Sequence, residues 1–170
     1  MECGRSNMTR KILDDPKELF RRWYKVPLKI LGDFTIVPRG DGGWIALAIS
    51  CLLFERYVSV KYKLENKKLR IKDEDIYAQL VVDFGTDKNT AKKFWDNVRN
   101  GLLHMGMPKQ KGGPIWEIYD EMPPFKLNDE KSRIYINVWK FRDRVIEILD
   151  NNPHYLTDGD YPWGHIWSEH

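Results

Sequence analysis

The chain has 170 residues, of which 42% are hydrophobic and 31% charged; these proportions exclude wholesale disorder and suit one globular domain. Lysine and arginine number 28 against 25 aspartate and glutamate, and the resulting +3 is too small to establish a nucleic-acid partner, although a clustered basic face could provide one. The two cysteines, Cys3 and Cys51, cannot form a disulfide framework or a four-ligand zinc site, which favours a reducing compartment.

The N-terminal part predicts a flexible segment followed by a helix. Residues 1–14 carry charges and no apolar run, so they do not resemble a secretory signal. Asp15 is a good helix N-cap, and Pro16 suits the first helical position. We expect this first helix to end near Gly32.

The second predicted helix covers residues 43–63 and is apolar on almost every side. Such a helix lies at the centre of a fold or is covered on both sides, for example by a second subunit. Its longest apolar run, residues 44–54, is well short of the roughly twenty residues that span a membrane. We therefore expect a cytoplasmic protein without a membrane partner. Residues 61–75 are strongly charged and predict a solvated turn.

Two further helices are predicted before the chain changes character. One covers residues 75–84 and ends at Gly85. The next is capped by Thr86 or Asp87 and continues to about Met105, before glycine and proline end it.

After residue 112 the pattern predicts strands, then a last helix. Residues 115–119 and 133–137 favour a small β-hairpin, with 123–130 between its strands. Residues 138–149 predict the last helix, and the aromatic segment 151–170 is expected to dock on the body. Residues 1–170 are thus predicted to form a single all-α domain, a bundle of about four to five helices with a small β-hairpin after the fourth predicted helix.

The most informative segment is the end of that fourth helix. In a regular helix, its apolar positions at 94, 98, 102 and 105 form one core-facing side. Asn100 and His104 are four residues apart and stack on roughly the opposite side, and Leu103 lies among them. Arg99 lies on the far flank of this surface and is long enough to reach around the helix. This outward face meets either solvent or a partner.

The run Arg99-Asn100-Gly101-Leu102-Leu103-His104 resembles the signature of the HEPN family, in which an arginine, usually followed by a polar residue, is separated from a histidine by four to six residues. The resemblance extends as architecture over residues 15–150, because HEPN domains are compact helical bundles with the motif late in a long helix. It implies a metal-independent endoribonuclease that acts as a homodimer, with RNA as its substrate and no cofactor.

The resemblance also implies a role for each motif residue. His104 would be general acid or base, and two copies across a dimer would divide these roles. Arg99 would hold the phosphate, and Asn100 would orient His104 or bind the phosphate. The expected products carry a 2′,3′-cyclic phosphate and a 5′-hydroxyl.

Residues outside the motif are candidates for supporting roles. Either Glu55 or Arg56 could support the motif from the second helix, with a surface ion pair as the alternative, and Glu55 is the candidate. Lysines near the motif could contact RNA, or be ordinary solvated charges. The lysines proposed for RNA contact are Lys92, Lys93, Lys109 and Lys111.

The remaining histidines predict no metal site. His154, His165 and His170 lie in the tail without the spacing of metal ligands. By what the family usually does, the protein would be a toxin or antiviral defence effector, with an antitoxin or regulatory subunit as a further partner. Two alternatives are a non-catalytic HEPN-like module that binds RNA, a nucleotide or a protein, and an unrelated helical scaffold with a coincidental motif.

Overall fold

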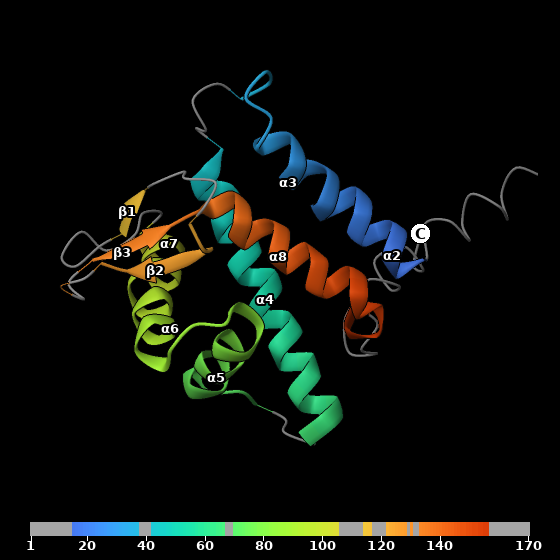
Figure 1. Ribbon diagram of the computed structural model, residues 1–170. Helices are drawn as coiled ribbons and strands as arrows, with labels where there is room; N and C mark the ends of the chain where they lie inside the picture. The colour runs from blue at the N-terminus through green and yellow to red at the C-terminus, as the bar shows by residue number, and fades with distance from the viewer. Residues whose placement is uncertain are drawn as a thin grey trace, which may run out of the picture.

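Two helices that are distant in sequence, α4 (Gly43–Asn66) and α8 (Val138–Asn151), pack against each other at the centre of the fold (Figure 1). The computed structural model describes residues 15–37, 42–66, 70–105, 114–116, 122–128, 130 and 133–156. The predicted flexible segment 1–14 and most of the predicted docking tail lie outside these residues.

The first helix is continuous but changes its winding. It consists of α2 (Pro16–Phe20), a π-helical turn η1 (Arg21–Lys25) and α3 (Val26–Leu31). Asp15 caps it by accepting a hydrogen bond from the Lys17 amide at 3.0 Å, and Gly32 ends it, as the sequence predicted. The wide turn has a local cause, because Pro27 lacks an N–H and its ring would collide with the carbonyl four residues earlier in a regular helix.

Helix α4 lies at the centre of the bundle, as predicted, but its outer side is open. One side is fully buried through Leu47, Cys51 and Phe54, whereas Leu52 remains 48% exposed. The helix continues to Asn66, so the first part of the expected charged turn is helical instead.

Helix α4 is also long and apolar enough to cross a membrane by length and composition. Of its most apolar stretch, 56% is buried inside the fold, and the core helix of a soluble protein passes the same test of length and composition. Location in the cell therefore stays a prediction.

In the central part of the chain, one helix is followed by a sharp turn at Gly85 and then by a long irregular helix. Helix α5 (Asp73–Phe84) ends at Gly85, whose φ of 64° is left-handed. Asp87 then caps α6 (Lys88–Phe94), accepting from the amides of Asn89 and Thr90 at 2.9 and 3.1 Å. A second π-helical turn, η3 (Trp95–Arg99), leads without a break into α7 (Asn100–Met105).

A small sheet follows, in the order β1-β3-β2. Strands β2 (Phe125–Leu127) and β3 (Ile134–Ile136) are antiparallel, which confirms a mostly helical fold with a small β-hairpin. The assignment of the hairpin strands was wrong, however. Strand β1 (Pro114–Trp116) pairs with β3 in parallel, and β2 lies in the segment expected to connect the strands. Tertiary packing explains β2, because Phe125 stacks on the ring of Phe94 with 4.3 Å between centroids.

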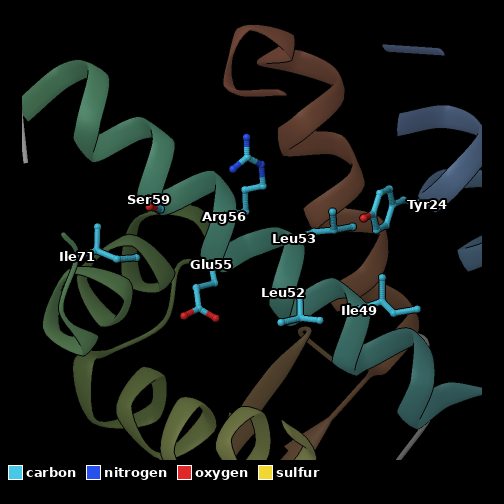
Figure 2. A pocket seen from close by; sticks show the side chains of 8 residues that line it. All are labelled: Tyr24, Ile49, Leu52, Leu53, Glu55, Arg56, Ser59 and Ile71. Atoms are coloured by element: carbon cyan, nitrogen blue, oxygen red, sulfur yellow. The ribbon is translucent and has the colours of Figure 1, made fainter. Parts of the chain in front are cut away.

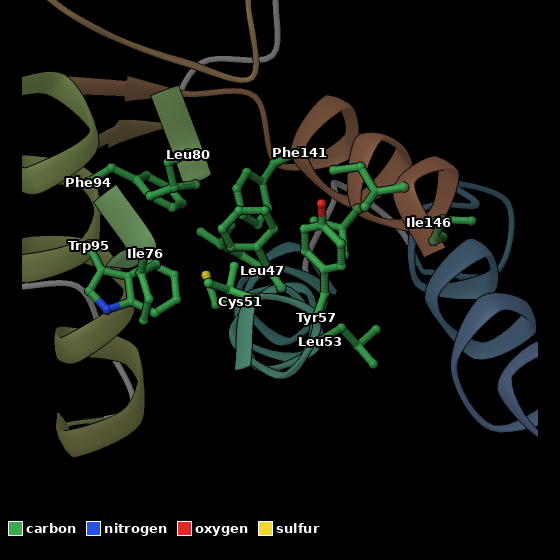
Figure 3. Packing of buried hydrophobic residues seen from close by; sticks show 14 of the residues in the cluster. Leu47, Cys51, Leu53, Tyr57, Ile76, Leu80, Phe94, Trp95, Phe141 and Ile146 are labelled. Atoms are coloured by element: carbon green, nitrogen blue, oxygen red, sulfur yellow. The ribbon is translucent and has the colours of Figure 1, made fainter. Parts of the chain in front are cut away.

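The core joins the helices through aromatic rings and aliphatic side chains from α4, α5, α6, η3 and α8 (Figure 3). Phe141 of α8 stacks on Phe84 at 4.9 Å and lies close to Phe54 of α4. Burial of this cluster is the main force that holds the layers together.

The described start of the tail lies against the bundle. In η4 (Pro153–Leu156), Tyr155 and Leu156 are buried. The Tyr155 ring meets Tyr57 edge to face at 5.3 Å, and its hydroxyl donates to Glu65. These contacts join the segment after α8 to the far end of α4.

Candidate functional site

The winding of the motif helix decides where Arg99 lies. A regular helix would place Arg99 on the outer flank, but the π-helical turn η3 widens the backbone over residues 95–99. The Arg99 side chain is only 16% exposed and reaches α4 instead of solvent. The sequence placed Arg99 on the flank of the helix with a side chain long enough to reach around it, and the structure shows that this side chain reaches Glu55 of α4. The core positions Phe94, Val98 and Leu102 are buried as predicted.

Four residues form a compact cluster around this arginine, called here the Arg99 cluster: Glu55, Trp95, Arg99 and Asn100. Arg99 forms an ion pair with Glu55 of α4 through Nη2, and its Nη1 donates to Asn100 Oδ1 at 2.8 Å. Its guanidinium lies over the buried Trp95 ring, 5.1 Å from the centroid. The acid, the amide and the indole thus fix the planar fork in one orientation.

Glu55 pairs with the motif rather than with its neighbour Arg56 in the described ion pairs. The sequence left open whether Glu55 supports the motif or forms a surface ion pair, and only the packing of η3 against α4 selects between the two. Cys51, which is fully buried, lies near Arg99 and Glu55 of the cluster. Burial raises the pKa of this thiol, so Cys51 stays protonated and is a packing residue rather than a nucleophile.

His104 lies one helical turn after Asn100, on α7, and is exposed to solvent. The neighbouring Leu103 is 37% exposed, a large fraction for a leucine beside a candidate site. The motif therefore has two parts in a single chain: an arginine held inside the Arg99 cluster and a histidine open to the outside.

The candidate RNA-binding lysines are only partly described. Lys92 pairs with Asp96 at 3.1 Å and lies over the Tyr77 ring at 5.2 Å. Lys93 is partly buried, and Lys109 and Lys111 lie outside the described residues. Lys92 is thus held toward α5 by its own partners, while its side chain remains largely exposed.

A pocket that sequence reasoning missed adjoins the Arg99 cluster. It has a volume of about 460 Å³ and opens on the outer side of α4 (Figure 2). Its lining residues are Tyr24, Ile49, Leu52, Leu53, Glu55, Arg56, Ser59 and Ile71. The α4 members recur at intervals of three and four, a signal present in the sequence, but Tyr24 and Ile71 join them only in the folded chain.

Across the part of the chain that the structure describes, no group of three or more histidine, cysteine or acidic side chains is placed to hold a metal ion. Comparison with known proteins found no matching family model, no matching curated protein and no matching solved structure.

Proposed function

We propose that this protein is a metal-independent endoribonuclease of the HEPN type, with an active site completed by two copies of the chain. The observation that carries the proposal is the Arg99 cluster, which holds an arginine fork one turn before the exposed His104. This is the pair of residues that the resemblance implies, and Glu55 supports the arginine from a neighbouring helix.

The chemistry suits these side chains. A base takes the proton from the ribose 2′-hydroxyl, the oxygen attacks phosphorus, and the bond to the 5′-oxygen breaks as an acid protonates that oxygen. Histidine titrates near neutral pH and can serve in either role. Arg99 offers a cation for the phosphate as charge builds up on it, with Asn100 beside it.

A second copy would supply what one chain lacks. One exposed His104 cannot be base and acid at once, whereas two copies can divide the roles. Leu103 beside His104 and the open side of α4, which packs against α7, leave apolar surface that a partner copy would cover. The resemblance adds a cytoplasmic role as a toxin or antiviral effector, restrained by an antitoxin or a regulatory subunit.

One observation favours a second candidate, a non-catalytic binding module. Arg99 is mostly buried, and both of its terminal nitrogens already have partners in Glu55 and Asn100. In this reading the arginine is structural, and only the surface around His104 binds RNA, a nucleotide or a protein.

An RNA cleavage assay in EDTA separates the two. The wild type, His104→Ala and Arg99→Ala would be compared on tRNA and mRNA, with His154→Ala, at an exposed position of η4, as a matched control. We expect both motif variants to lose roughly 10²-fold or more of the rate and the control to lose nothing. The products should carry 2′,3′-cyclic phosphates. Cleavage that survives both changes, or 3′-hydroxyl ends, would overturn the proposal, and RNA binding without cleavage would favour the binding module.

A further inference from the structure

The first helix is apolar on its outer side as well as on the side that faces the core. Its inner side is buried through Leu19, Phe20 and Leu28. On the outer side, Trp23, Val26 and Ile30 are between 37% and 43% exposed. Their separations of three and four residues place them along one side of the helix, and they are called here the outer stripe. A helix that is apolar on both sides is usually covered on both sides.

The C-terminal segment of the chain begins beside this helix. In η4, Tyr155 and Leu156 are buried, and η4 contacts α2, α4 and α8. Lys25 Nζ of the first helix pairs with Asp150 Oδ2 at the end of α8 at 2.5 Å. Figure 1 shows the end of α8 close to α2. Residue 157 therefore leaves the bundle next to the start of the first helix.

The segment of residues 157–170 is long enough to follow the outer stripe. The first helix, residues 16–31, is about 24 Å long at 1.5 Å per residue. An extended chain covers about 3.3 Å per residue, so residues 157–166 alone can reach about 33 Å from η4. Because the segment is tethered beside the helix, it meets the stripe at an effective concentration on the order of millimolar.

The segment and the helix are also complementary in composition. The large apolar and aromatic residues of the segment are Tyr161, Trp163, Ile166 and Trp167. Its acids are Asp158, Asp160 and Glu169, and it contains no lysine or arginine. The helix carries five basic residues over 16–31 against a single acid, Glu18. Arg22 and Lys29 are exposed and lie four residues before and three residues after Val26, beside the stripe.

We propose that residues 157–170 pack along the outer stripe of the first helix in the same chain. Burial of the two indole rings against the stripe supplies most of the free energy, and the acids of the segment add attraction to Arg22 and Lys29. The tether favours the chain's own helix over that of a second copy. This inference is independent of the proposed ribonuclease function, because no residue of the motif takes part.

Chymotrypsin measures the packing without any variant. The protease cleaves after tryptophan, and it would cut at Trp163 and Trp167 when the segment is released. Mass spectrometry would compare the cleavage rate in the full chain with that in an acetylated synthetic peptide of residues 157–170. We expect cleavage in the chain to be about tenfold slower or more, since the protease cuts only the fraction of chains in which the segment is open. Equal rates in the chain and the peptide would overturn the proposal.

Val26→Glu tests whether the outer stripe is the surface that holds the segment. The new carboxylate opposes both the burial and the acids of the segment, so the cleavage rate should rise toward that of the peptide. Val82→Glu is the matched control, because Val82 is an exposed apolar residue of α5, and it should keep the wild-type rate. Circular dichroism would check that each variant is folded.

Arg22→Glu is a second variant, at an exposed charged position that tolerates change, and it should raise the cleavage rate several-fold. Faster cleavage in a folded Val26→Glu or Arg22→Glu supports the stripe. Wild-type rates in both, or an equal rise in Val82→Glu, would overturn the assignment of this surface.

Dilution separates the chain's own helix from the helix of a partner copy. Packing within one chain gives a cleavage rate constant that does not change with protein concentration. Protection that is lost on dilution would overturn the contact within the chain and assign the segment to a second copy.

Discussion

Arg99 donates a hydrogen bond to the carboxylate of Glu55, a residue 44 positions earlier, and so ties the motif helix to the central helix α4. The contact depends on the π-helical turn over Trp95–Arg99, which directs the guanidinium inward. π-helical turns inside α-helices are frequent at functional sites, and this one separates the two candidate catalytic side chains into a held arginine and an exposed histidine.

The first prediction concerns the strength of this ion pair. Glu55→Ala should lower the free energy of unfolding by about 1.5–3 kcal/mol, because it leaves a mostly buried guanidinium without its acid. Glu55→Gln keeps an acceptor and should cost less. Denaturant unfolding of the wild type, Glu55→Ala, Arg99→Ala and the double variant gives the coupling energy, expected at about 1–2 kcal/mol. If the losses of unfolding free energy in the two single variants added up to the loss in the double variant, the ion pair between Arg99 and Glu55 would contribute nothing to stability.

The second prediction concerns self-association. Leu103→Lys places a charge on the exposed apolar surface beside His104 and should shift the protein from dimer to monomer, with loss of RNA cleavage although His104 is intact. Light scattering at tens of micromolar would measure the mass. Val82→Lys, at an exposed apolar position on α5, is the control and should remain dimeric. A wild type that is already monomeric would contradict the shared site.

The third prediction is a pH dependence that comes from Asp83. Burial is the main cause that raises the pKa of this carboxyl, although Gln79 donates to it at 2.7 Å and Lys61 attracts its charge. The folded protein therefore binds this proton more tightly than the unfolded chain does. The stability contributed by Asp83 is complete below its unfolded pKa and is lost as the pH rises through the raised, folded-state pKa.

Asp83→Asn stays neutral at every pH and isolates this effect. The stability of Asp83→Asn relative to the wild type should increase as the pH rises from below the ordinary pKa of an aspartate through the raised, folded-state pKa of Asp83, because only the wild type must ionise a buried carboxyl. Urea unfolding at a series of pH values measures the difference. A difference that stayed constant or declined would contradict the raised pKa of Asp83.

The fourth prediction concerns the corner between α5 and α6. Gly85 has a φ of 64°, and a Cβ there would meet nothing within 4 Å. Gly85→Ala should therefore cost about 1 kcal/mol through backbone strain alone, and Gly85→Asn should cost less, because asparagine tolerates the left-handed region. Thermal and urea unfolding would show this order. Equal costs for the two variants would point to a lost contact rather than to backbone strain.

Local chemistry made several elements of the fold predictable. Asp15 with Pro16 marks the start of the first helix, and Gly85 marks the end of α5, because caps and left-handed glycines act through near neighbours in the chain. Strand β2 was missed for the opposite reason. Phe125 belongs to a strand because it packs on Phe94 and pairs with β3, and neither contact is visible in three residues of sequence.

In the candidate site, too, some features follow from local sequence and others depend on tertiary packing. The spacing of Asn100 and His104, and the burial of Phe94 and Val98, followed from the sequence by itself, because they depend on helical periodicity within a few turns. Only the tertiary structure decided that Arg99 turns inward to Glu55, and that Tyr24 and Ile71 close a pocket over α4. The inward position of Arg99 depends on the π-helical turn over Trp95–Arg99, and the pocket depends on the packing of elements that are distant in the chain. Neither is a property of local sequence.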